Sequence, residues 1–216
     1  MDGTLLDLHF DSYFWMEHLP LRYAQIHNLD LAQVKADLIS QIKSEQGKLN
    51  WYSLDYWSQR FVVDVPSLKR EIQHLISFRA DALAFLRNLK KRQQHSLTSL
   101  KIVLATNADR KSLDLKLPLT RLDQYVDFIH SSSDSGSPKE EQAYWHSLMQ
   151  VTPFDPETTL LIDDNESVLN SAHNFGIQQL ITIEQPDSQT RRSISSSFPA
   201  INKFAELQLE ANHDNR

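Results

Sequence analysis

The second half of the sequence alternates short, mostly apolar runs with segments of helical periodicity. The apolar runs are Ile102–Leu104, Val126–Ile129, Leu160–Ile162 and Leu180–Ile183. Runs that are apolar on both faces are typical of strands in a parallel sheet covered by helices on each side. We therefore predict an α/β protein with a Rossmann-like parallel sheet.

A long helical region precedes these runs. Apolar residues recur at helical spacing in two of its stretches, Leu31, Val34, Leu38 and Ile42 in the first and Leu68, Ile72, Leu75 and Ile76 in the second. Asp2 and Thr106 are polar residues that we expect at strand ends, and they are 104 residues apart in the chain. A crossover between neighbouring parallel strands needs only a few tens of residues. We expect a helical insertion, the cap, over residues 12–77, and an α/β core made of residues 1–11 and 78–216.

Charge and composition exclude several classes of function. The chain has 22 Lys and Arg against 28 Asp and Glu, a net charge of −6, and no basic stripe for nucleic acid. It has no cysteine, which excludes disulfides, thiolate metal sites and a cysteine nucleophile. Its apolar runs are far shorter than the roughly 20 residues that span a bilayer. We expect a cytoplasmic protein without a nucleic-acid or membrane partner.

Polar residues follow the predicted strands, where ligands bind in parallel α/β sheets. They are Thr106-Asn107, Asp163-Asp164, the N-terminal Asp2-Gly3-Thr4, and Lys139 in Ser137-Pro138-Lys139-Glu140, which we interpret as a helix start with Ser137 as N-cap and Glu140 completing a capping box. Taken singly, each is equally consistent with a turn, a helix cap or a surface lysine. Together, the acidic pair, the hydroxyl and the ammonium group predict a site that holds Mg²⁺ and a phosphoryl group.

These motifs resemble those of the haloacid dehalogenase (HAD) superfamily, in the family's order and over nearly the whole chain. The four are Asp2-Gly3-Thr4-Leu5-Leu6-Asp7, the Ile102–Asn107 segment, Lys139, and Leu160–Asp164. More narrowly, three segments are similar to the bacterial GMP/IMP 5′-nucleotidase branch: Asp7–Asp11, Asn50–Trp57 and Pro138–Gln142. Receiver domains share an acidic pair, a Thr and a Lys, but in them the acidic pair comes first.

The resemblance implies a role for each matched residue. Asp2 would be the general acid and base, with its backbone carbonyl on Mg²⁺. Thr106, aided by Asn107, would bind the transferring phosphoryl group. Lys139 would offset negative charge. Asp164 would ligate Mg²⁺, and Asp163 would either ligate it or support the ligands.

One position of the family pattern lies outside the sequence. The nucleophilic aspartate of the family stands two residues before the residue matched by Asp2. We expect the natural protein to extend upstream by about 10–20 residues, which supplies this aspartate and the apolar first strand of the sheet. The alternative, if Met1 is the true start, is a non-catalytic HAD-like binding module.

The resemblance to the nucleotidase branch implies that purine 5′-mononucleotides are the substrates. Trp51 and Tyr52, with Trp57 nearby, could stack on a base, an interaction of about 1–3 kcal/mol. These aromatic residues could equally form the hydrophobic core of the cap. Phosphoglycolate and sugar phosphates are the alternative substrates.

Overall fold

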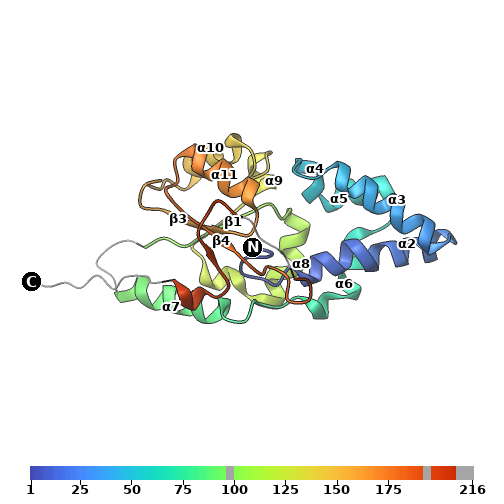
Figure 1. The fold of residues 1–216 in the computed structure, drawn as a ribbon, viewed down its shortest axis with the longest axis horizontal. Coiled ribbons are helices and arrows are strands. Elements are labelled where there is room, and N and C mark those ends of the chain that lie inside the picture. Colours follow the sequence, from blue (N-terminus) through green and yellow to red (C-terminus); the bar gives the residue numbers. More distant parts are fainter. Residues whose placement is uncertain (96–99, 192–195, 208–216) are drawn as a thin grey trace, which may run out of the picture.

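The computed structural model describes residues 1–95, 100–191 and 196–207. Helices account for most of residues 9–75, which lie at one end of the elongated molecule (Figure 1). They are α1 (His9–Tyr13), the π-helical turn η1 (Phe14–His18), α2 (Leu19–His27), α3 (Leu31–Ser44), α4 (Leu49–Tyr52), α5 (Leu54–Phe61), α6 (Val65–Glu71) and the 3₁₀ turn η2 (Gln73–Leu75).

These helices share one hydrophobic cluster. Its centre is aromatic: Trp57 and Phe14 are fully buried, and Trp57 stacks on Phe61 at a centroid distance of 5.2 Å. Val34, Leu38 and Ile42 of α3 are buried as the periodicity predicted, whereas Leu31 is exposed. Leu31 is the first residue of α3, and a side chain there extends past the end of the packed face.

The remaining elements alternate strands and helices. They are α7 (Ala82–His95), β1 (Val103–Thr106), α8 (Arg110–Thr120), η3 (Leu122–Tyr125), β2 (Phe128–Ser131), α9 (Ser132–Ser135), α10 (Gln142–Val151), β3 (Leu160–Asp163), α11 (Glu166–Phe175), β4 (Gln179–Ile183), β5 (Ala200–Ile201) and η4 (Phe204–Glu206). Helices α10 and α11 lie on one side of the strands and α7 on the other (Figure 1). The predicted α/β class is confirmed.

All strand pairing is parallel, and it is divided into two groups. β1 pairs with β2, with Val103 opposite Phe128. β3 pairs with β4, with Leu160 opposite Gln179, and β4 pairs with β5. The two groups meet through side chains packed between them, since Val103, Ala105 and Leu161 contact the same cluster around Tyr144 and Trp145.

Within the described residues, no helix is long and apolar enough to cross a bilayer. The cytoplasmic location and the domain boundaries at residues 12–77 stay predictions.

Candidate active site

The N-terminal loop packs directly against Asp164. Gly3 has φ +74°, and a Cβ atom there would overlap the Asp164 carboxylate, so this position requires glycine. Thr4 Oγ1 donates a hydrogen bond to Asp164 Oδ1 at 3.2 Å. The first and fourth motifs are therefore in contact although 160 residues separate Thr4 from Asp164.

Lys139 connects the second, third and fourth motifs. Its backbone N–H donates to Asn107 Oδ1 at 2.8 Å, and its buried ammonium group forms an ion pair with Asp163. Burial alone would lower the pKa of Lys139, but the Asp163 carboxylate raises the pKa above its usual value. Lys139 therefore carries its positive charge at the carboxyl end of β3.

The predicted helix start at Ser137 is wrong. Lys139 lies in a turn, and α10 begins only at Gln142. The groups that a capping box would need are used elsewhere. The N–H of Ser137 donates to Ser135 Oγ at 3.2 Å, and the Glu140 carboxylate accepts hydrogen bonds from other residues.

Asp164 carries the strongest electrostatic signal for a cation. Burial, and then repulsion from Asp163, raise the pKa of Asp164 to about 6. Asp163 itself accepts the N–H of Asn165 on Oδ1 at 3.0 Å, besides its ion pair with Lys139. Two adjacent carboxylates of this kind fit Mg²⁺, which takes one or two carboxylates and completes its shell with water and phosphate oxygens.

The described residues do not form a metal site with more carboxylate or imidazole ligands than the Asp163–Asp164 pair. Within residues 1–95, 100–191 and 196–207, no three His, Asp or Glu side chains are grouped so as to hold a metal ion. The Asp2 side chain faces Lys116, with 2.7 Å between Asp2 Oδ1 and Lys116 Nζ. Any contribution of Asp2 to the metal is therefore expected from its backbone.

Thr106 lies where the resemblance requires a phosphoryl ligand. It is the last residue of β1 and is buried, and its Oγ1 accepts the N–H of Ala108 at 3.1 Å. The next residue, Asn107, uses both ends of its amide, with Oδ1 on Lys139 and Nδ2 on Glu140 at 2.9 Å. We call Asp2, Thr106, Asn107, Lys139, Asp163 and Asp164 the phosphate site.

A second buried charge network joins the phosphate site to the cap. Lys116 Nζ bonds Asp11 Oδ2 at 2.6 Å as well as Asp2, and Lys69 Nζ bonds Asp11 Oδ1 at 2.5 Å. Our sequence analysis missed these three residues. The sequence could have indicated Lys116, because helical spacing places it on the same face as Leu113 and Leu117. A lysine buried on such an apolar face needs a charged or polar partner.

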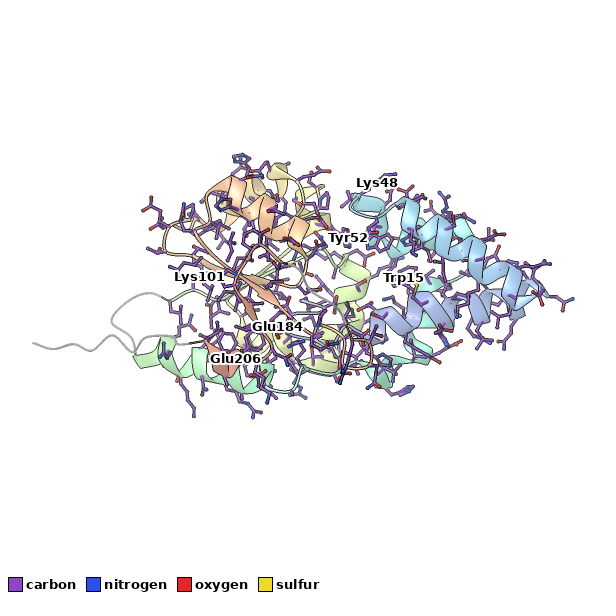
Figure 2. The ribbon with its side chains drawn as sticks, in the orientation of Figure 1. Trp15, Lys48, Tyr52, Lys101, Glu184 and Glu206 are labelled. Carbon is purple, nitrogen blue, oxygen red and sulfur yellow. The ribbon has the colours of Figure 1, made fainter. Side chains whose placement is uncertain are left out.

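The two aromatic residues predicted to bind a base lie in different surroundings. Tyr52, on the side of the cap that faces the α/β core (Figure 2), donates from its hydroxyl to Glu140 Oε1 at 2.6 Å. Burial, and then the Glu140 charge, raise the pKa of Tyr52, so the phenol stays protonated. Trp51 packs against the hydrophobic cluster of the cap, and its carbonyl accepts from Trp57 Nε1 at 3.0 Å.

The fold is that of HAD-type proteins. The model of the haloacid dehalogenase-like hydrolase family matches residues 1–182, and the chain belongs to this family. It is 34% identical over 207 residues to the GMP/IMP nucleotidase YrfG of Escherichia coli, covering 96% of this chain and 90% of that protein.

Solved structures share the fold. A HAD phosphatase from Thermococcus onnurineus superposes with a TM-score of 0.77 at 18% identity, over 96% of this chain and 93% of that one. The magnesium-bound HAD-hydrolase YfnB from Bacillus subtilis superposes with a TM-score of 0.62 at 20% identity, over 96% and 94% of the two chains.

Proposed function

We propose that this protein is a Mg²⁺-dependent phosphomonoester hydrolase that releases phosphate from the purine 5′-nucleotides GMP and IMP. One observation carries the reaction class: hydrogen bonds and ion pairs link Asn107, Lys139 and Asp163 at the ends of β1 and β3. The extent of the similarity to a GMP/IMP nucleotidase supports the substrate.

Each residue of the phosphate site has a distinct role in this proposal. Thr106 and Asn107 hold the phosphoryl oxygens, and Lys139 offsets their charge. Asp164, supported by Asp163, holds Mg²⁺, which supplies further positive charge when bound. Asp2 gives a proton to the leaving oxygen and then takes one from the attacking water.

The nucleophile in this proposal is the aspartate that the family pattern places two residues before the position matched by Asp2. Its carboxylate oxygen attacks phosphorus, the ester P–O bond breaks, and the leaving alkoxide receives the Asp2 proton. Water then cleaves the aspartyl-phosphate and restores the carboxylate.

The assay compares this chain with one extended upstream by about 20 residues. We expect Mg²⁺-dependent phosphate release from GMP and IMP by the extended chain, and a loss of at least about 100-fold in kcat for Asp2→Asn and for Asp164→Asn. Asp123→Asn, at an exposed carboxylate on η3, is the matched control. Equal rates for Asp164→Asn and the control would reject the metal role.

Three further outcomes bear on the substrate and on the alternatives. If the extended chain binds phosphate esters but releases no phosphate, the protein is a HAD-like binding module. If Trp51 stacks on the purine, Trp51→Ala raises KM for GMP more than for a small generic phosphate ester. A preference for phosphoglycolate or a sugar phosphate over GMP would replace the nucleotide assignment.

A further inference from the structure

Glu140 lies where the cap meets the strand ends. Its carboxylate accepts hydrogen bonds from three side chains of different origin. Asn107 follows β1 and donates at 2.9 Å, Asn165 follows β3 and donates at 3.2 Å, and Tyr52 of the cap donates at 2.6 Å. Glu140 is half-buried, and it is adjacent in the chain to Lys139.

The cap is fixed against the α/β core at this same place. The N–H of Leu54 donates to the buried Asp109 Oδ2 at 2.7 Å, two residues along from Tyr52. Asp109 is itself held as the N-cap of α8, where its Oδ1 accepts the N–H of Ser112. In the proposed function, the leaving group of a phosphate ester whose phosphoryl group lies at Thr106 and Lys139 would extend toward this junction, where Glu140 and Tyr52 lie.

The charges around this position are unfavourable for an anionic leaving group. The buried ammonium groups nearby are already paired, Lys139 with Asp163, and Lys116 with Asp2 and Asp11. Glu140 receives its three hydrogen bonds from uncharged donors. The Lys139 charge also acts on Glu140, but this ammonium group is already paired with Asp163, so the negative charge of Glu140 is only partly balanced. Glu140 therefore repels a carboxylate while it accepts hydrogen bonds from hydroxyl groups.

We propose that Glu140 is a specificity-determining residue that selects phosphate esters with a neutral, hydroxyl-bearing leaving group and rejects esters whose leaving group carries a carboxylate. This inference rests on the proposed function and narrows its substrates. It favours a nucleotide or sugar phosphate over phosphoglycolate, because the ribose of a nucleotide offers hydroxyl donors to Glu140.

Binding measurements test the proposal without requiring turnover. Calorimetry in the presence of Mg²⁺ gives the affinities of this chain for inorganic phosphate, ribose 5-phosphate and phosphoglycolate. We expect Glu140→Gln to raise the affinity for phosphoglycolate, relative to inorganic phosphate, by about tenfold. The same substitution should leave the affinity for ribose 5-phosphate unchanged or lower it, since Gln retains only one acceptor oxygen.

Two further variants separate charge from structure. Glu141→Gln removes the same charge one residue away, at an exposed side chain, and should leave the ratio of phosphoglycolate to phosphate affinity within twofold of wild type. Tyr52→Phe removes the hydrogen bond that the cap donates to Glu140 but keeps the Glu140 charge, so it should not raise this ratio.

The outcomes are distinct. If Glu140→Gln leaves the ratio of phosphoglycolate to phosphate affinity within twofold of wild type, the role of Glu140 is overturned. The role is also overturned if Glu141→Gln shifts this ratio as much as Glu140→Gln does. An equal shift in Tyr52→Phe assigns the selectivity to cap docking and also overturns it. If the wild-type chain binds none of the three probes, the same titrations are made with the upstream-extended chain. Absence of binding there overturns the proposed function, whereas binding with an unchanged ratio in Glu140→Gln overturns only the role of Glu140.

Discussion

The cap and the sheet achieve their burial in different ways. The helices of residues 9–75 enclose a shared cluster in which Phe14, Leu19, Trp57 and Val65 are completely buried. By contrast, Leu160, Leu161 and Ile162 of β3 are only half-buried, although strands of parallel sheets are usually covered on both faces. The cap is thus packed by its own residues, whereas the two strand groups are held together by side chains, including the Lys139–Asp163 pair of the phosphate site.

The sharpest test of this difference is a pair of truncations, one in each region. Trp57→Ala empties the centre of the cap cluster and should lower the free energy of unfolding by about 4–5 kcal/mol. Leu161→Ala removes a half-buried side chain of β3 and should cost only about 1 kcal/mol. Urea denaturation followed by circular dichroism measures both. A larger loss for Leu161→Ala would show that the sheet is the better packed region.

The positions of the strands could be predicted from the sequence because they depend on periodicity, whereas the half-burial of β3 could not, since its apolar run predicts a strand covered on both faces. The strands predicted at residues 102–104, 160–162 and 180–183 have bounds within one or two residues of those observed for β1, β3 and β4. The convergence of Asn107, Lys139 and Asp163 was also predictable, since parallel strands end at one edge of a sheet.

Other features depend on tertiary contacts that no local pattern encodes. β5 has only two residues, too few for a period. The role of Glu140 depends on how the cap docks, which brings Tyr52 to a residue 88 positions away. The helix start expected at Ser137 failed for the same reason, because Asn107 competes for the N–H of Lys139.

The charge network around Asp11 tests the junction between the two regions. Two buried lysines, Lys116 and Lys69, hold the pKa of Asp11 well below its usual value despite its burial. A depressed pKa stabilises the fold at all pH values above the unfolded value of about 3.8, and this contribution is lost as the pH falls below it. Asp11→Asn should cost about 3 kcal/mol at pH 7 and should flatten the loss of stability below pH 3.8.

The control for this network is an exposed pair within the cap. Glu17 forms an ion pair with Lys35 at 2.5 Å, and more than half of the Glu17 side chain is exposed. Because exposed pairs contribute little, Glu17→Gln should change the free energy of unfolding by less than about 1 kcal/mol and leave the acid slope unchanged. Denaturation curves at several pH values between about 1.5 and 7 measure both variants. Identical acid slopes for wild type and Asp11→Asn would contradict the stabilising role of the network.

The smallest expected effect concerns a local defect in the well-packed cap. Val62 ends α5 with φ +54° and ψ +45°, a left-handed conformation that a β-branched residue rarely adopts, and 77% of its surface is exposed. Asn28 ends α2 with nearly the same angles, φ +54° and ψ +49°, and asparagine tolerates them. Val62→Asn should therefore stabilise the protein by about 0.5–1 kcal/mol, measured as a rise in Tm. The control is Val151→Asn, at an exposed residue within the last turn of α10, which should give no such gain in Tm. An equal rise in Tm in both variants would show that replacing an exposed valine by a polar side chain is enough, without relief of backbone strain.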